Sequence, residues 1–281
     1  MPHLALDDGF RFYYETHGPA INSPGAATPI LFAHGAGGNA MSWWQQVPAF
    51  ADRYPIITFD HRAFGRSVDI EDGPGRIAFG ADVRALLDYL EVDRVHFIAH
   101  SMGGRTAFAL FSRDPQRVVS FTYSGTNGGV VDDRYRALKQ RLEDEGEFAG
   151  SLLSRALKKG YADEEPVKAH LYRQLRSINP KRPADFLAQN PPRPRNGAGG
   201  SAAARLAASG LPILWIVGDG DRVVHPDLIQ ISHDLTPGSW FHEVRDAGHS
   251  TYFERPGDWN GAVRRFLDAV EDGTWQPLRR D

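Results

Sequence analysis

The sequence predicts an α/β protein whose central sheet is mostly parallel and carries helices on both faces. Short, mainly apolar runs at 29–33, 56–59, 95–99 and 213–217 are typical of strands that are buried on both sides. Segments with apolar residues at three- and four-residue spacing alternate with these runs, as helices do in β–α–β units. In such a sheet, functional groups gather beyond the carboxyl ends of the strands.

The expected elements up to residue 123 follow directly from these patterns. They are a hairpin of strands 4–6 and 10–15 turning at Asp8-Gly9, a loop over 18–29, the strand 29–33, a helix over 42–51 with Ser42 as N-cap, the strand 56–59, a loop over 65–75, a helix over 77–90, the strand 95–99, a helix over 105–111 and a strand over 118–123. The pattern resumes after residue 212 with the strand 213–217, a helix over 226–235, a strand over 240–244, a helix over 257–270 and an unstructured tail over 273–281.

The stretch between these two parts is different in character. From Asp132 to about Asn190 the chain is charged and shows helical spacing without a convincing strand, which predicts helices over 134–142, 148–158 and 164–178. The breaker-rich run 190–200 closes this stretch. We therefore expect a core of residues 1–130 and 201–281 and an inserted helical cap, residues 131–200.

Composition restricts the class of protein. Of 281 residues, 41% are hydrophobic and 24% charged, as in ordinary globular proteins, and the net charge of −3 without a long basic run argues against nucleic acid or an anionic membrane as partner. The complete absence of cysteine excludes disulfides, a thiolate nucleophile and a Cys-ligated metal. No apolar stretch reaches membrane-spanning length and the first ten residues lack the signal-peptide pattern, so a cytoplasmic location is expected. The sequence does not indicate an oligomeric state.

Ser101 lies where an apolar strand meets a helix. Small residues stand two positions before it, Ala99, and two positions after it, Gly103, which is the spacing of a nucleophile elbow. A turn this sharp brings neighbouring backbone so close that both flanking side chains must be small. Ala99 stands where the usual pattern has a glycine, and its methyl group should fit.

A serine hydroxyl needs a general base, and the base needs a group that fixes its tautomer. Asp221 follows a strand in a Gly-x-x-Asp turn, and His249 lies in the loop after the last strand. The chain order Ser, Asp, His is that of a hydrolase triad, in which His249 takes the serine proton and Asp221 binds its other ring nitrogen. Asp219, in the same turn, remains an alternative acid.

Attack on a carbonyl creates an oxyanion that needs donors already in place. The backbone N–H of Met102, just after the serine, is the first candidate. The second is the N–H of Ala36, in the glycine-rich loop 34–38 that follows the strand 29–33, where glycine lets the backbone approach a substrate closely.

Four motifs at strand ends together resemble the α/β-hydrolase superfamily, in its branch with a helical cap. They are HGAGG at 34–38, DHRAFGRS at 60–67, HSMGG at 100–104 and AGHSTYFERP at 247–256. The similarity covers nearly the whole chain except the cap and both termini. It implies a cofactor-independent serine hydrolase, acting on a carboxylic ester or lactone of a small, partly apolar molecule, and is greatest to esterases, enol-lactonases, perhydrolase-type enzymes and carbon–carbon bond hydrolases.

Single residues separate related activities. Relatives that open epoxides or displace halide carry an aspartate nucleophile, whereas this chain has Ser101. Carbon–carbon bond hydrolases usually have tryptophan after the catalytic histidine, and here Ser250 follows His249. A carbon–carbon bond hydrolase with the same triad and a non-catalytic ligand-binding member of the fold remain the alternatives.

Other polar residues have simpler interpretations. His34, His61, His100 and His225 lack paired metal-ligand spacing, so we expect no metal site, with His34 and His100 shaping the pocket floor or bonding to backbone. Asp246 is expected to be a surface or supporting carboxylate. Arg62 and Arg66 could bind an acidic group of the substrate, although loop arginines are usually solvated. The aromatic residues Trp43, Trp44, Phe148, Tyr161 and Tyr172 are expected either in the core or on an apolar acyl pocket.

Overall fold

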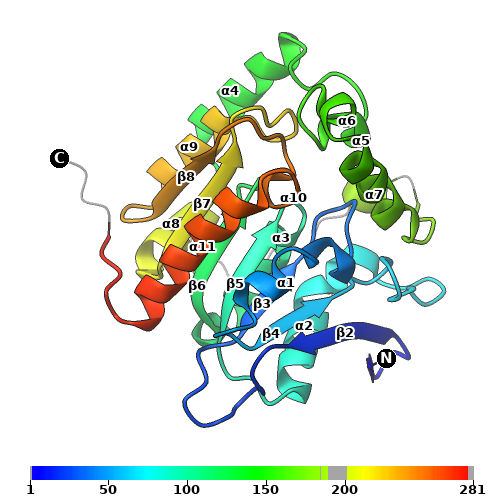
Figure 1. Ribbon diagram of the computed structural model, residues 1–281, viewed down its shortest axis with the longest axis vertical. Coiled ribbons are helices and arrows are strands. Elements are labelled where there is room, and N and C mark those ends of the chain that lie inside the picture. The colour runs from blue at the N-terminus through cyan, green and yellow to red at the C-terminus, as the bar shows by residue number, and fades with distance from the viewer. Residues whose placement is uncertain (1, 184, 189–200, 278–281) are drawn as a thin grey trace. The chain divides into compact units, whose positions relative to one another are not determined.

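The computed structural model describes residues 2–183, 185–188 and 201–277, and Figure 1 labels their helices and strands. The chain forms two compact units. One comprises Met1–Val119 and Leu171–Gly197, and the other Ser120–His170 and Ala198–Asp281. Strand β6 (Val118–Ser124) and helix α7 (Pro166–Ser177) each continue from one set of residues into the other.

The sheet strands of the first unit have the order β1-β2-β4-β3-β5. Their bounds are β1 His3–Ala5, β2 Arg11–His17, β3 Ile30–Ala33, β4 Ile56–Phe59 and β5 Val95–His100. β2 pairs antiparallel with β1 and β4, whereas β3 pairs parallel with β4 and β5. Every residue of β3, β4 and β5 is buried, which explains why their sequences are mainly apolar and do not alternate.

The helical segments of the first unit support this sheet. They are the 3₁₀ helices η1 (Ala40–Trp43), η2 (Gly75–Ala78), η3 (Pro115–Arg117) and η4 (Phe186–Ala188) and the α-helices α1 (Val47–Phe50), α2 (Phe79–Tyr89) and α3 (Gly103–Arg113). Helix α3 packs on β3 and β5, and α2 packs on α3 (Figure 1). The start of α3 is thereby fixed directly after the end of β5.

The continuous helix expected over 42–51 was wrong. The chain forms η1 and the short α1 instead, and Asn39 rather than Ser42 is the N-cap of η1. The Asn39 side chain accepts from the Met41 N–H at 3.1 Å, and the Ser42 hydroxyl accepts from the Asn39 N–H at 3.1 Å. Pro48 has no N–H to give to a carbonyl one turn earlier, so the backbone ladder cannot run through this position.

The second unit contains three parallel strands in the order β6-β7-β8, with β7 at Ile213–Gly218 and β8 at Trp240–Val244. All six residues of β7 are buried. Helices α9 (Pro226–Asp234) and α11 (Pro256–Glu271) both pack on β7 and β8 (Figure 1). Parallel strands covered by helices confirm the predicted fold class.

The helices between β6 and β7 differ in length from those expected. Helix α4 (Asp133–Asp144) contains the predicted helix 134–142, whereas only α5 (Leu152–Arg155) forms within 148–158. The helix expected over 164–178 forms as α7, which begins at Pro166. A short helix that was not expected, α6 (Tyr161–Glu164), precedes it, and Pro166 lacks the N–H that would join the two. The helices α8 (Ala202–Ser209) and α10 (Thr251–Glu254) were also missed.

The predicted cap, 131–200, contributes residues to both units, and its assignment as a separate domain stays a prediction. The breaker run 190–200 lies outside the described residues, as do the last four residues of the predicted tail. Among the helices that are described, none combines the length and hydropathy needed to cross a bilayer.

Candidate active site

Ser101 occupies a sharp turn between β5 and α3. Its φ of +50° lies in the left-handed region, which is unfavourable for a residue with a side chain. A Cβ at Gly103 would lie 2.5 Å from the carbonyl oxygen of Ala33 on β3, and Ala99 stands directly opposite Ala33 in the neighbouring strand. Close approach of β3 therefore explains why small residues flank the serine on both sides.

The glycine-rich loop 34–38 passes against this turn. A Cβ at Gly35 would lie 3.1 Å from the Cβ of Ser101 and 2.8 Å from the His100 ring. The N–H groups of Ala36 and Met102 have no acceptor among the described residues, whereas the following N–H groups of Gly104 and Arg105 bond to Ser101 and Met102 carbonyls. The turn thus offers two backbone donors from the two positions predicted for the oxyanion hole.

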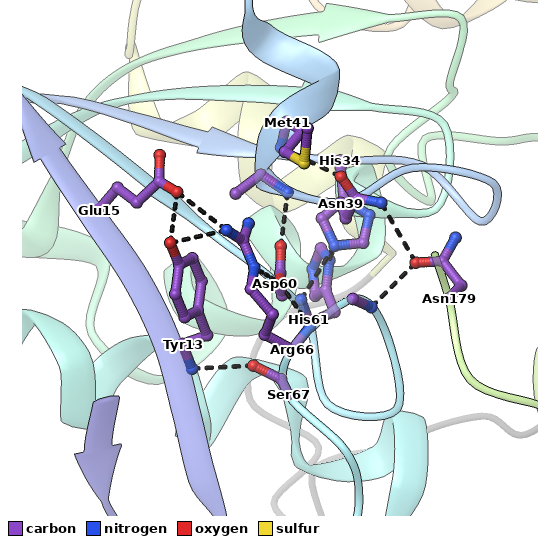
Figure 2. Close-up of polar contacts among 12 residues, drawn as sticks. Tyr13, Glu15, His34, Asn39, Met41, Asp60, His61, Arg66, Ser67 and Asn179 are labelled. Carbon is purple, nitrogen blue, oxygen red and sulfur yellow. Dashed lines mark hydrogen bonds and ion pairs between the residues drawn. The ribbon is translucent and has the colours of Figure 1, made fainter. Parts of the chain in front are cut away.

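Two histidines hold the base of this loop (Figure 2). The His34 Nε2 accepts the His61 N–H at 2.9 Å, so the proton of His34 resides on Nδ1, which donates to the Gly35 carbonyl at 2.8 Å. The His61 ring contacts His34 Nε2 through Nδ1 at 3.1 Å and the Thr106 hydroxyl through Nε2 at 3.0 Å. Burial lowers the pKa of His34 to about 4 and the pKa of His61 well below its usual value, so both are neutral at pH 7.

A buried carboxylate connects this loop to the next one. Asp60 accepts the Ala40 N–H at 2.6 Å, the Arg66 N–H at 2.7 Å and the Arg66 Nε at 3.0 Å (Figure 2). Arg66 also donates to the Tyr13 hydroxyl at 2.7 Å and to Glu15 at 3.2 Å, and its guanidinium lies 3.5 Å from the centre of the Tyr13 ring. The charge of Arg66 is therefore satisfied within the protein.

Arg62 is fully buried, so the expectation that it is solvated was wrong. Its guanidinium donates to both oxygens of Asp82 at 3.0 and 2.8 Å, to Asp69 at 3.1 Å and to Asp8 at 2.9 Å. It also stacks 3.8 Å from the centre of the Phe10 ring. With three carboxylates as partners, Arg62 fixes structure, and neither Arg62 nor Arg66 is placed to take an acidic group of a substrate.

The stretch after α7 lies against the glycine-rich loop. Asn179 donates to the Gly37 carbonyl at 3.1 Å and accepts the Gly65 N–H at 2.9 Å, and Figure 2 shows its side chain facing Asn39. Asn39 in turn donates to the Leu175 carbonyl at 2.8 Å. These bonds join residues more than a hundred positions apart, and no motif in the sequence indicates them.

His249 and Asp221 meet in the second unit. The His249 Nδ1 lies 2.8 Å from Asp221 Oδ2, and both side chains are buried. The other Asp221 oxygen accepts the N–H groups of Val223 and Val224 at 2.7 and 2.9 Å. Asp219, the alternative acid, instead accepts the N–H groups of Asp246 and Ala247. Because Nδ1 faces the Asp221 carboxyl group, the nitrogen of His249 that is left to accept a proton from a serine is Nε2.

Glu254, which sequence reasoning missed, lies beneath the histidine loop. Its buried carboxylate accepts the Gly248 N–H at 3.1 Å and the Lys158 N–H at 2.9 Å. Burial raises the pKa of Glu254 to about 7. The signal available in the sequence was one glutamate among the apolar residues of a short segment after His249. Asp246, expected at the surface or in a supporting role, is exposed and pairs with Lys158 at 2.6 Å and with Arg255.

The predicted aromatic residues divide between core and surface. Trp43 is fully buried and its ring centre lies 4.7 Å from that of Phe32, whereas Trp44 is 45% exposed. Tyr161 is also buried. Among the described residues, no group of three or more His, Asp or Glu side chains is arranged to hold a metal ion.

Comparison with known proteins identifies the family of this chain. Residues 28–256 match the profile of the alpha/beta hydrolase fold. The chain is 27% identical over 255 residues to 3-oxoadipate enol-lactonase 1 of Acinetobacter baylyi, covering 89% of this chain and 92% of the relative. It is similar to the solved structure of an N-acyl homoserine lactone degrading enzyme, with TM-score 0.69, 26% identity and coverage of 94% and 100% of the two chains.

A thermophilic esterase from Thermogutta terrifontis shares the fold, with TM-score 0.74, 20% identity and coverage of 96% and 100%. The family profile spans most of the sequence, from just before β3 to the start of α11. This chain belongs to the alpha/beta hydrolase fold family.

Proposed function

We propose that the protein is a serine hydrolase that cleaves a carboxylic ester or lactone through an acyl-enzyme. The observation that carries the proposal is the strained turn at Ser101, which holds the hydroxyl-bearing residue beside two backbone N–H groups without acceptors among the described residues. A strained backbone persists where the surrounding structure enforces it, and such sites are commonly functional. The bonded pair His249–Asp221 supplies a base and its orienting acid.

In the proposed reaction, the Ser101 oxygen attacks the carbonyl carbon while His249 Nε2 takes the serine proton. The negative charge that develops on the carbonyl oxygen is stabilised by the N–H groups of Met102 and Ala36, each of which is expected to contribute about 10²–10³ in rate. Collapse of the intermediate expels the alkoxide, which receives the proton from His249. Water then attacks the acyl-enzyme by the same route, so protein groups and water suffice for the whole cycle.

The relatives support the same bond class. The relative at 27% identity over 255 residues is an enol-lactonase, and the solved structure at 26% identity is of a lactone-degrading enzyme. Both names describe hydrolysis of a cyclic ester. We extend this class of substrate to the present chain, with residues 131–200 proposed as the cap that helps to select it.

Replacement of Ser101 by alanine tests the proposal. Ser101→Ala should lower kcat for a 4-nitrophenyl ester by about 10⁴-fold or more, because no other group can form the acyl-enzyme. The measurement is release of 4-nitrophenolate, with circular dichroism to verify folding. Ser209→Ala removes a hydroxyl that donates to the Leu206 carbonyl and accepts the Leu211 N–H at the end of α8, and this variant should retain activity. Full activity in Ser101→Ala would overturn the proposal.

A further inference from the structure

Two arginines after His170 differ from the other arginines near the glycine-rich loop. Arg62 and Arg66 pair with carboxylates, whereas Arg176 on α7 and Arg182 beyond it have no carboxylate partner among the described residues. Both side chains are partly buried. Partly desolvated cations without a counter-ion are unusual, because burial without compensation is unfavourable.

Arg176 lies directly over the glycine-rich loop. Its Nη1 is 2.6 Å from the place that a Cβ at Gly37 would take, so a side chain at this position would displace the guanidinium. Gly37 follows Ala36, whose N–H is a proposed oxyanion donor. The guanidinium of Arg176 is therefore held next to the loop that would face the reacting carbonyl.

Arg182, which follows Asn179 in the sequence, contacts the same glycine-rich loop. It donates to the carbonyl oxygens of Ala63 at 3.1 Å and Ala36 at 3.4 Å, and its guanidinium lies 3.9 Å from the centre of the Phe64 ring. Phe64 belongs to an apolar cluster that also includes Met102 and has Ala36 packed against it. The guanidinium thus lies next to Ala36, whose N–H is one of the two proposed oxyanion donors.

The two cations lie close enough to oppose one another. Burial, together with the Arg176 charge, lowers the pKa of Arg182. The hydrogen bonds of Arg182 to neutral carbonyl groups offset only part of the unfavourable free energy of burying this charge beside Arg176. An anion bound between the two guanidinium groups would reduce their repulsion. It would also accept hydrogen bonds from the guanidinium N–H groups that do not bond to carbonyl oxygens.

We infer that Arg176 and Arg182 form a subsite for a carboxylate of the substrate, next to the loop that carries Ala36. The inference rests on the proposed function and makes it more specific: the ester or lactone carries a free carboxylate. A guanidinium matches a carboxylate through paired N–H donors. The net charge of the protein is −3, so the attraction for such a substrate would come from these two local cations and not from the overall charge.

Matched substrate pairs test this subsite. On the acyl side, 4-nitrophenyl hydrogen adipate is compared with 4-nitrophenyl hexanoate, and on the alcohol side 4-acetoxybenzoate is compared with its methyl ester. The readout is the ratio of kcat/KM for the anionic member to kcat/KM for the neutral member. In the wild type this ratio should exceed one for at least one pair, and Arg176→Gln should lower it about tenfold or more through loss of a charge-assisted bond.

Arg176→Gln is the first variant because the guanidinium of Arg176 bonds to no described carbonyl, whereas that of Arg182 bonds to the carbonyls of Ala63 and Ala36. Thermal unfolding verifies that the variant is folded. Arg176→Lys keeps the charge and should retain part of the preference. Arg265→Gln removes an exposed arginine of α11 that also has no ion pair among the described residues, and should leave the ratio unchanged. Arg182→Gln should lower the ratio as well, with thermal unfolding used to verify its stability.

The outcomes separate this inference from the proposed function. If Ser101-dependent hydrolysis occurs and neither pair shows an anionic preference that falls in Arg176→Gln, the carboxylate subsite is wrong and the hydrolase stands. If no ester is hydrolysed, the proposed function fails, and calorimetric binding of adipate to the wild type and to Arg176→Gln decides the subsite alone. Binding of equal strength to the two proteins, or no binding to the wild type, would overturn it.

Discussion

At the scale of single residues, Glu254 couples the histidine loop to a segment of the predicted cap. Its carboxylate bonds to the N–H of Gly248, immediately before His249, and to the N–H of Lys158. The Ser250 N–H also donates to the Ala156 carbonyl at 3.0 Å. A Cβ at Gly248 would lie 2.3 Å from the Lys158 nitrogen, so the two segments are in close contact. Glu254 is thus a positioning residue for the loop that carries His249.

The raised pKa of Glu254 predicts a pH-dependent stability. Because burial raises the pKa from 4.5 to about 7, the folded state holds the proton more tightly than the unfolded chain. This contribution is present in full below about pH 4.5 and is lost as the pH rises through 7. Glu254→Gln does not titrate, so the unfolding free energy of the wild type relative to this variant should fall by about 3 kcal/mol between pH 4.5 and pH 8.

Urea unfolding of both proteins across this pH interval measures the difference in unfolding free energy. The lowered pKa of His34 destabilises the folded state at low pH, but this effect is common to both proteins and cancels in the comparison. Glu243→Gln, which removes an exposed carboxylate on β8, is the matched control for loss of charge. If the difference in unfolding free energy between the wild type and Glu254→Gln stays constant from pH 4.5 to pH 8, the raised pKa of Glu254 is wrong.

Site residues that the sequence predicted make different bonds from site residues that only the structure revealed. Ser101 and His249 stand in short motifs with a chemical reason, and the structure shows Asp221, not Asp219, at the His249 ring. Glu254 and Asn179 bond to backbone groups of segments far away in the chain. Backbone partners leave no trace in side-chain identity, so the sequence alone could not reveal these two.

At the scale of elements, strands were predicted more accurately than helices. Burial on both faces leaves a continuous apolar run, and β4 and β8 begin and end at the expected residues. The helix expected over 42–51 failed because a local cap at Asn39 and Pro48 decided its ends. Short helices such as α5 depend on packing rather than on periodicity, so their limits could not be predicted.

The junction of β5 and α3 should tolerate no enlargement at Gly103. Gly103→Ala places a methyl group 2.5 Å from a backbone oxygen of β3, and backbone cannot move aside as a flexible side chain can. Overpacking of this kind costs about 1–3 kcal/mol, and the shift it forces at the Ser101 turn should also lower kcat. Urea unfolding and ester turnover measure the two effects.

Gly257→Ala is the control, because no atom lies within 4 Å of its added Cβ and it stands in the first turn of α11. This substitution should be neutral or stabilising by up to about 1 kcal/mol. Equal stability and activity of Gly103→Ala and Gly257→Ala would refute the steric explanation of the elbow.

At the scale of the whole molecule, the predicted cap is shared between two compact units. Residues 171–188 bring Arg176, Asn179 and Arg182 to the glycine-rich loop of the first unit, whereas Ala156 and Lys158 contact the histidine loop of the second. The sequence predicts an inserted helical segment over 131–200. It does not reveal this division, because the contacts involved join groups across long sequence separations and most of them use backbone atoms.

The central claim is that Ser101 is a nucleophile activated by His249. Reaction with a fluorophosphonate probe, followed by mass spectrometry of the labelled peptide, tests it most directly. We predict modification of Ser101 in the wild type, no label in Ser101→Ala, and labelling slowed at least about a hundredfold in His249→Ala, because the hydroxyl then lacks its base. An unlabelled wild type, a label on another serine, or unchanged labelling of His249→Ala would contradict the claim.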